Sequence, residues 1–331
     1  MTSSNDYINE SVFNTNLKYV RLQNKTKELF FKCLDEGRDL DYFKEELEKI
    51  WGNVDHKFFK AQLEEYENIV HRENLNSLDI KEDIPKVINT FIGLVALGII
   101  LKQEKKFITL KEREYKLSLK SNAYKVAKDE YLKNKVQKYT NQIVPYFSKT
   151  TGKKIRDVQL STYTAMIHNT NLTRAGWNTT ISDAENLGYR EFYIPPHSFS
   201  CPYCAYYQGR PLSVDEVTSY LGLEAEEQEG DILHPNCKCV LAIYSWGMNI
   251  RKQKYTPMEL QQQYDIRQKT NSLTLKKEQL LSDIKIQKSL GNYDEVDKLN
   301  SQRNKINSQI RELKEQLPTK ELQKQVTAIN R

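Results

Sequence analysis

Residues 200–204 read Ser-Cys-Pro-Tyr-Cys and residues 234–239 read His-Pro-Asn-Cys-Lys-Cys, so two tight pairs hold four of the chain's five cysteines. A spacer of 32 residues without cysteine separates Cys204 from Cys237. Two short thiol pairs joined by a loop can close a tetrahedral metal site, because each pair supplies two ligands from one turn of backbone. We therefore expect residues 198–244 to fold around such a site.

The two pairs offer five candidate ligands for four places: Cys201, Cys204, His234, Cys237 and Cys239. Cys237 and Cys239 would point the same way in a regular strand, because side chains alternate with a period of two. His234 could instead bind the metal together with one of these cysteines. Four protein ligands leave no place for a catalytic water, so the pattern predicts a structural zinc ion. The alternatives are four reduced cysteines without metal, or a reversible disulfide pair.

The composition is typical of a folded, helix-rich chain. Of 331 residues, 38% are hydrophobic and 28% charged, with few glycines and prolines. The fold class we predict is mainly α with a small α+β module, in three parts. These parts are a helical N-terminal region (1–149), a compact cysteine-containing domain with short strands (150–250), and a basic helical tail (251–331). Cys33 stands alone in a helical segment, which does not fit a secreted disulfide framework.

Charge alternates strongly along the chain. Net charge is −6 for residues 1–83, +11 for 84–160, −6 for 161–250 and +7 for 251–331. Basic blocks of this density attract nucleic acid or an acidic protein surface, although a solvated lysine-rich helical face gives the same count.

No membrane attachment is expected from the sequence. The first residues carry neither the basic nor the apolar region of a signal peptide. The most apolar run, residues 87–101, is shorter than the roughly 20 residues of a membrane span, and it contains Asn89 and Thr90. We expect a buried helix there.

Helical periodicity covers most of the chain. Residues 7–75 predict helices interrupted at Gly37 and Gly52, and residues 102–147 predict one long helix. Residues 155–188 predict a helix with a break near Gly176 and an end at Gly188.

Two strands and a terminal hairpin complete the predicted elements. Residues 190–194 and 239–244 are typical of short strands, so each cysteine pair lies next to one. Residues 258–317 predict a helical hairpin with a turn at residues 290–292. Its second arm carries a short heptad seam: Val296, Leu299, Ile306, Ile310, Leu313 and Leu317.

The sequence contains no catalytic pattern that we could assign. His168, His197 and His234 fall into no serine-histidine-aspartate or cysteine-histidine arrangement, and no glycine-rich phosphate loop is present. The acidic cluster at residues 224–231 predicts a solvated loop. We therefore do not expect an enzyme.

Three motifs together resemble the signature of the minor head proteins of tailed phages, the head-morphogenesis proteins similar to the F protein of phage Mu. They are Cys-Pro-Tyr-Cys at 201–204, Tyr-Gln-Gly-Arg at 207–210 and His-Pro-Asn-Cys-Lys-Cys at 234–239, preceded by a helix at 174–189. The resemblance covers about residues 150–246. Lys238 stands where the family usually has arginine, and the spacer carries an acidic insert.

The resemblance implies a structural protein of the virion that associates with the portal and other head proteins and takes part in head morphogenesis, and in DNA packaging or delivery. The expected location is the capsid interior or portal vertex, with the host cytoplasm as the place of assembly. Basic helices beside packaged DNA would fit this role.

Two rival functions share parts of the pattern. Treble-clef and HNH-type nucleases place a catalytic histidine on a zinc knuckle, but they need a further metal-binding group that we could not assemble here. A toxin with a Mu F-like domain is the other rival, and residues 251–331 offer no catalytic pattern for it.

Overall fold

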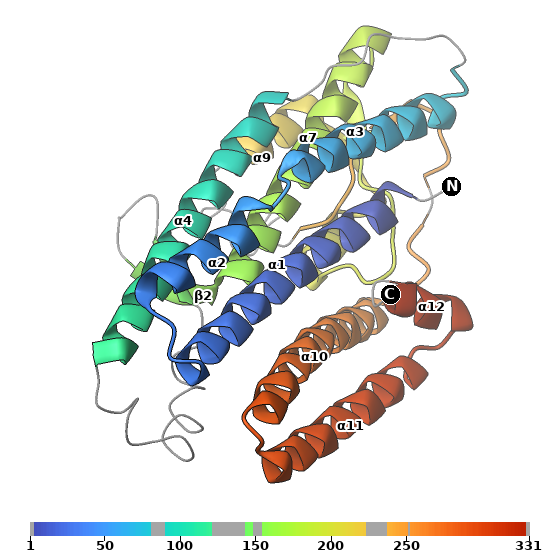
Figure 1. Ribbon diagram of the computed structural model, residues 1–331. Helices are drawn as coiled ribbons and strands as arrows, with labels where there is room; N and C mark the ends of the chain where they lie inside the picture. The colour runs from blue at the N-terminus through green and yellow to red at the C-terminus, as the bar shows by residue number, and fades with distance from the viewer. Residues whose placement is uncertain are drawn as a thin grey trace.

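The computed structural model describes residues 3–80, 90–120, 143–147, 154–222, 237–250 and 252–328 (Figure 1). It is mainly helical with a small three-stranded sheet, as predicted. The helices are α1 (Ser4–Asp35), α2 (Leu40–Gly52), α3 (Lys57–Ser77), α4 (Thr90–Lys120), α7 (Leu160–Leu187), α8 (Pro202–Tyr207), α9 (Val214–Gly222), α10 (Pro257–Ser289), α11 (Tyr293–Glu315) and α12 (Lys320–Ala328). The strands are β1 (Ile143–Phe147), β2 (Lys154–Gln159), β3 (Glu191–Tyr193), β4 (Pro211–Ser213) and β5 (Ala242–Tyr244).

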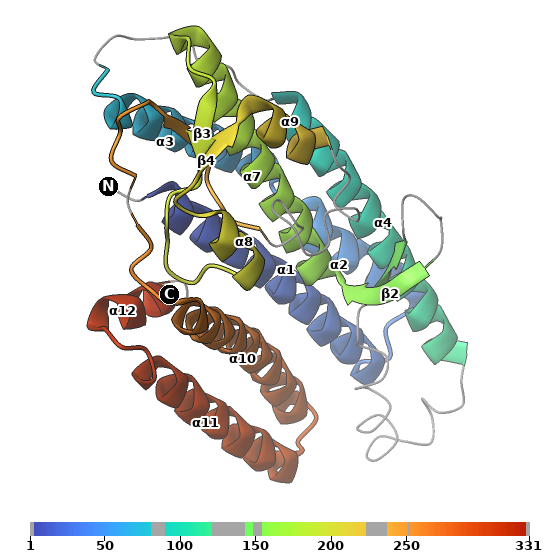
Figure 2. The same ribbon diagram turned by 180° about the vertical axis from the view of Figure 1, so that it is seen from behind.

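Helix α7 is the central element. It packs against α1, α3 and α4, while the small sheet and α9 lie near its C-terminal half and α8 lies near α10 (Figure 2). Its Leu172 and Trp177 are fully buried. A buried polar contact also joins α3 to α7, because Nδ1 of His71 lies 2.8 Å from a carboxylate oxygen of Asp183. The helix that precedes the cysteine motif in sequence therefore forms the scaffold for it.

The predicted helix breaks in the N-terminal region are confirmed. Helix α1 ends at Asp35, and Gly37 follows with φ of 65°. Helix α2 is capped by Asp39, whose side chain accepts a hydrogen bond from the backbone of Tyr42, and it ends at Gly52. The predicted end of α7 is also confirmed, since Gly188 takes the left-handed conformation with φ of 77°.

An aromatic core joins the first, second and fourth helices. The rings of Phe43 and Tyr115 stack with centroids 4.1 Å apart, and Phe30 meets both edge-on. Leu160 of α7 and Ile286 of α10 belong to the same buried cluster. The apolar faces of all three predicted parts of the chain therefore contribute to one core.

The small sheet has the order β4-β3-β5 and is antiparallel throughout. In its centre Phe192 is paired with Leu212 on one side and Ile243 on the other, and all three are buried. The strand predicted at 190–194 is confirmed as β3. The strand predicted at 239–244 is shorter, because only β5 forms ladder bonds and residues 237–241 run extended without them.

The helix predictions for residues 143–147 and 155–159 were wrong. A β-hairpin of β1 and β2 occupies the end of the predicted helix 102–147 and the start of the predicted helix 155–188. Helix α4 is described only to Lys120, and residues 121–142 lie outside the described residues. β1 reads Ile-Val-Pro-Tyr-Phe, and periodicity alone cannot distinguish such a short apolar run from part of a buried helix, which explains the error there.

The predicted break near Gly176 was also wrong, because α7 runs through this residue. The glycine serves close packing instead. A Cβ atom on Gly176 would stand 2.7 Å from Cε1 of the buried Tyr66 ring. Only a residue without a side chain lets α3 approach α7 this closely.

The apolar run at 87–101 is partly buried. Residues 87–89 lie outside the described part, and α4 begins at Thr90. Ile100 is buried, but Leu94 is 60% and Leu101 42% exposed, so the prediction of a buried helix holds for one face only. No described helix has the length and apolar content needed to cross a membrane.

The predicted C-terminal hairpin is confirmed as α10 and α11, with the turn at Leu290–Asn292. Helix α10 begins with a capping box. The side chain of Thr256 accepts the backbone N–H of Glu259, and the side chain of Glu259 accepts the backbone N–H of Thr256. Val296, Leu299 and Ile306 of the seam pack on α10, whereas Leu317 joins a separate cluster with α12. The hairpin lies along α1 (Figure 1).

Candidate metal centre

The two cysteine pairs meet beside α7, although they belong to different kinds of structure. Cys201 caps the N-terminus of the short helix α8, and Cys204 lies in the first turn of that helix. Cys237 and Cys239 lie on the extended segment 237–241 that leads into β5. The Sγ atoms of Cys204, Cys237 and Cys239 all lie within 4.8 Å of one another, and those of Cys204 and Cys237 are 3.5 Å apart.

Side chains of α7 hold the extended segment through its backbone carbonyls. Four donors at steps of four, four and three residues share one face of the helix: Asn169, Thr173, Trp177 and Thr180. The amide of Asn169 and the hydroxyl of Thr173 donate to the Cys237 carbonyl at 2.8 and 2.9 Å. The indole of Trp177 donates to the Cys239 carbonyl at 2.9 Å.

The spacing of these acceptors explains why the second pair converges. Thr180 donates to the carbonyl of Leu241 at 3.1 Å. The carbonyl groups of residues 237, 239 and 241 therefore all point toward α7. Alternate residues of an extended chain share an orientation, so the side chains of Cys237 and Cys239 also share one. The expectation that these two thiols point the same way is met.

All four thiols of the cluster are buried, and none forms a disulfide. Hydrogen bonds with Cys201 and Cys237, together with burial, raise the pKa of the Cys204 thiol well above its usual value. A divalent cation would overcome this cost, because it stabilises the thiolates and releases their protons. The environment therefore suits either protonated thiols or a metal complex, and disfavours isolated thiolates.

Two cations border the cluster. The guanidinium of Arg267 on α10 is buried, lies 3.8 Å from the centre of the Phe199 ring, and its Nε has no hydrogen-bond partner in the described part of the chain. Burial lowers the pKa of Arg267 to about 9, and burial with the nearby Arg267 lowers the pKa of the half-buried Lys238 to about 7. Positive charge held away from water is stabilised by negative charge nearby, which metal-bound thiolates supply.

The geometry fits a tetrahedral metal ion. Bonds of about 2.3 Å from zinc to sulfur place two ligand sulfurs about 3.8 Å apart. The 3.5 Å between Cys204 and Cys237 is close to this, and the other separations among the three thiols stay within 4.8 Å. A hollow of about 20 Å³ beside the thiols is large enough for a single ion or water. Shifts below about 1 Å would bring the three sulfurs onto one ion.

The structure brings three of the five predicted ligands together. Cys204, Cys237 and Cys239 form the converging group, and Cys201 lies beside Cys204, with its Sγ accepting the Cys204 backbone N–H at 3.3 Å. His234 lies outside the described residues. Cys33 is buried in the aromatic core and takes no part.

Sequence reasoning did not assign His197 to this site. Nε2 of His197 lies 3.6 Å from Sγ of Cys239, and its Nδ1 donates to the carbonyl of Ser198 at 2.9 Å. Burial lowers the pKa of His197, which favours the neutral ring. The sequence signal that could have identified His197 is its position four residues before Cys201, directly after Pro195 and Pro196.

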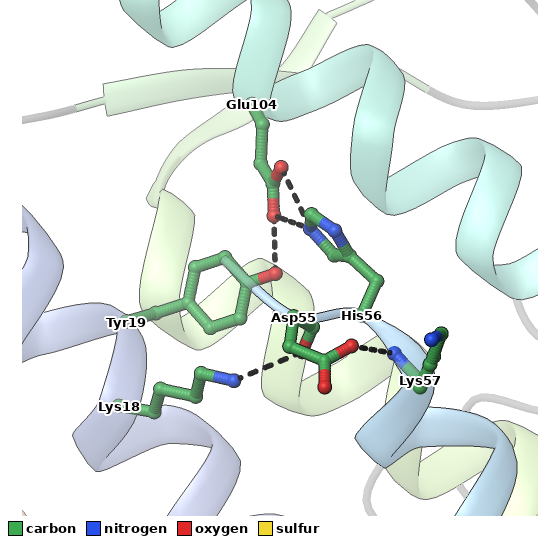
Figure 3. A network of polar contacts seen from close by, with 6 residues as sticks. All are labelled: Lys18, Tyr19, Asp55, His56, Lys57 and Glu104. Atoms are coloured by element: carbon green, nitrogen blue, oxygen red, sulfur yellow. Dashed lines mark hydrogen bonds and ion pairs between the residues drawn. The ribbon is translucent and has the colours of Figure 1, made fainter. Parts of the chain in front are cut away.

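A second polar cluster lies between α1, α3 and α4 (Figure 3). The buried carboxylate of Glu104 accepts the hydroxyl of Tyr19, and Nε2 of His56 lies 3.0 Å from both of its oxygens. A mainly apolar cavity of about 370 Å³ adjoins His56. The hydrogen bonds of Glu104 join α1, α4 and the N-terminal end of α3.

Comparisons with protein-family models, with curated proteins and with solved structures gave no match.

Proposed function

We propose that this chain is a minor head protein of a tailed phage, a structural component that associates with the portal and acts in head morphogenesis. The observation that carries the proposal is the run of motifs at 201–204, 207–210 and 234–239. Gln208, in the second motif, donates to Ser200 at 2.9 Å beside the first, which supports reading them as parts of one module.

Within this function, a zinc ion bound by the cysteine cluster has a structural role. It would join α8 to the segment 237–241, which is held by hydrogen bonds on the middle of α7, and so fix α8 to that helix. The burial of three converging thiols next to Arg267 supports zinc over a bare thiol cluster.

Contact with DNA or an acidic portal surface is assigned to two basic helical faces. The described part of α4 exposes Lys102, Lys105, Lys106, Arg113 and Lys116. The C-terminal helices expose Lys269, Lys276, Lys285, Lys288, Lys298, Lys305, Arg311, Lys320 and Lys324. Such faces bind phosphates through charge without reading sequence, which suits a protein that lies against packaged DNA.

The role in the head is tested by inspecting the neighbouring genes and by co-expression with any portal protein that they encode. We expect a portal gene immediately upstream, a complex that survives size-exclusion chromatography, and the chain as a low-copy component of purified virions by mass spectrometry. A chain that is absent from the virions and does not bind the portal protein would refute the proposal.

DNA contact is tested separately with the purified full chain. We expect affinity for duplex DNA to fall steeply between about 50 and 200 mM salt, as counterion release requires. A DNA affinity that does not change with salt would contradict electrostatic contact of these basic faces with DNA. Cleavage of plasmid DNA that needs a divalent metal and is abolished by His234→Ala would instead favour the nuclease class.

Zinc is tested by metal analysis of the reduced protein purified without added chelator. One equivalent is expected in the wild type and in Cys33→Ser, because Cys33 lies in the separate aromatic core. Cys204→Ser should lose most of the metal. Equal metal content in all three proteins, or none in the wild type, would contradict a zinc ion held by the cluster.

A further inference from the structure

We propose that His197 is the fourth ligand of the metal, together with Cys204, Cys237 and Cys239, and that Cys201 serves as the capping side chain of α8. This inference rests on the proposed metal site, whose fourth ligand the cysteine pattern left open. It replaces a four-cysteine or His234-containing set with a set of three thiolates and one imidazole.

The distance from His197 to the cluster carries the first part of the argument. A tetrahedral zinc ion with bonds of about 2.3 Å to sulfur and about 2.0 Å to nitrogen places the two ligand atoms about 3.5 Å apart. Nε2 of His197 lies 3.6 Å from Sγ of Cys239. This pair therefore already has the separation of two neighbouring ligands, as does the Cys204–Cys237 pair at 3.5 Å.

The tautomer of the ring carries the second part. The carbonyl of Ser198 can only accept, so Nδ1 of His197 must be the protonated nitrogen in its 2.9 Å hydrogen bond. The lone pair then lies on Nε2, the atom that faces Cys239. Metal-binding histidines almost always donate their other ring N–H to a carbonyl or carboxylate, which fixes the ring in this way.

The backbone around His197 is fixed independently of any metal. Pro195 and Pro196 restrict the chain where it leaves β3, and the side-chain amide of Gln253 donates to the carbonyl of His197 at 3.3 Å. The same amide donates to the side chain of Gln208 at 2.8 Å, next to the end of α8. His197 is thus anchored to the helix that carries Cys204.

Cys201 has a different task in the described chain. Its Sγ accepts the backbone N–H of Cys204 at 3.3 Å, the bond that an N-cap side chain makes to the first turn of a helix. Cys201 and His197 both lie outside the group of three thiols whose sulfurs are all within 4.8 Å of one another, so the choice between them rests on the capping bond of Cys201 and on the 3.6 Å contact of His197 with Cys239. Binding of the metal by the proposed set releases three thiol protons and leaves the Cys201 thiol protonated.

The experiment compares zinc affinity and cobalt spectra of the full chain and four variants. His197→Gln should weaken zinc binding at least about tenfold, since changes to groups that merely support a ligand already cost 10- to 100-fold. Cys201→Ser keeps a capping oxygen and should bind as the wild type does. His234→Ala should also bind normally, and Cys204→Ser is the control that must lose the metal.

Cobalt(II) in place of zinc counts the thiolates directly. Cys201→Ser should retain the full thiolate-to-cobalt absorption of the wild type, and this holds as a test even if His197→Gln fails to fold. Loss of about a quarter of that absorption in Cys201→Ser, or normal zinc affinity in His197→Gln, would overturn the inference while leaving the metal site intact. Weakened binding in His234→Ala would overturn it as well. A wild type without metal would refute the proposed site itself.

Discussion

The indole Nε1 of Trp177 donates a hydrogen bond of 2.9 Å to the carbonyl oxygen of Cys239. Both groups are buried, and the bond links the centre of α7 to the backbone of a proposed metal ligand. The helix thereby fixes the direction in which that cysteine points. The stability of the scaffold and the affinity of the metal site are expected to be coupled through this contact.

Replacing Trp177 with Phe should therefore have two effects. The carbonyl of Cys239 loses its donor in a buried place, which lowers the free energy of unfolding by about 1–3 kcal/mol. Zinc affinity should fall about tenfold, because the ligand is held less firmly. Chemical denaturation and a zinc-competition titration measure the two effects.

Thr173→Val is the matched control for this prediction. It removes one donor to the Cys237 carbonyl, but Asn169 still donates to the same oxygen at 2.8 Å. The loss of zinc affinity should be clearly smaller than in Trp177→Phe. An equal or larger loss would show that α7 does not act through the individual carbonyls.

Gly176→Ala should destabilise the protein although alanine is the better helix former. A Cβ at this position would stand 2.7 Å from Cε1 and 3.0 Å from the hydroxyl oxygen of the buried Tyr66. Overpacking of this kind costs about 1–3 kcal/mol, against a gain of up to about 1 kcal/mol from helix propensity. Urea denaturation should show a net loss.

Gly98→Ala provides the control in α4, because nothing lies within 4 Å of its added Cβ. It should raise the free energy of unfolding by up to about 1 kcal/mol. Stabilisation of both alanine variants would contradict the conclusion that close packing of α3 against α7 excludes a side chain at position 176.

His168 should make stability depend on pH. Burial lowers the pKa of His168 to about 3, whereas an unfolded histidine titrates near 6.5. Between these values the unfolded state binds more protons, so stability rises with pH and is lost as pH falls from 6.5 toward 3. The contribution is at most about 1.4 kcal/mol per pH unit.

His168→Gln isolates the contribution of His168 to the pH dependence of stability. Glutamine does not titrate, and it can still bond to Ser11, whose hydroxyl lies 2.8 Å from Nε2 of the histidine. Between pH 6.5 and 5 the wild type should lose about 1–2 kcal/mol more than the variant in denaturation experiments. Parallel pH profiles for the two proteins would mean that His168 is accessible to protons in the folded state.

Glu104→Gln should weaken the contact between α1, α3 and α4. The carboxylate accepts from Tyr19 and from His56 at once, and glutamine presents an N–H to one of these donors (Figure 3). We expect a loss of about 1–3 kcal/mol in the free energy of unfolding. The exposed Glu45, which pairs with Lys49 at 3.0 Å, is the control, and Glu45→Gln should change stability by less than about 1 kcal/mol. Similar losses in both variants would contradict a special role for Glu104.

Several features were predictable because their causes are local in sequence. Helices of the N-terminal region, the glycine cap at Gly188, the strand at 190–194 and the C-terminal hairpin all follow from periodicity and from residues with fixed conformational preferences. The grouping of Cys204 with Cys237 and Cys239 was predictable too, since close thiol pairs make a metal site recognisable without knowing the rest of the fold.

Other features depend on what packs against what. Gly176 signals a helix break in sequence, but the ring of Tyr66, 110 positions away in the chain, makes it a packing residue inside a helix. The β-hairpin of β1 and β2 replaced predicted helix, because pairing between strands decides the conformation of such short segments. The polar cluster around Glu104 assembles residues from three helices that share no sequence motif.

By itself the sequence determined the helical class and the ends of several elements, because these depend on neighbours within a few residues, and it identified the two close cysteine pairs as candidate ligands. Only the tertiary structure decided which face of α7 holds the second cysteine pair, that His197 adjoins Cys239, and that Arg267 from a distant helix borders the cluster. These relationships join segments tens of residues apart, and they arise from the burial of apolar faces rather than from any local preference.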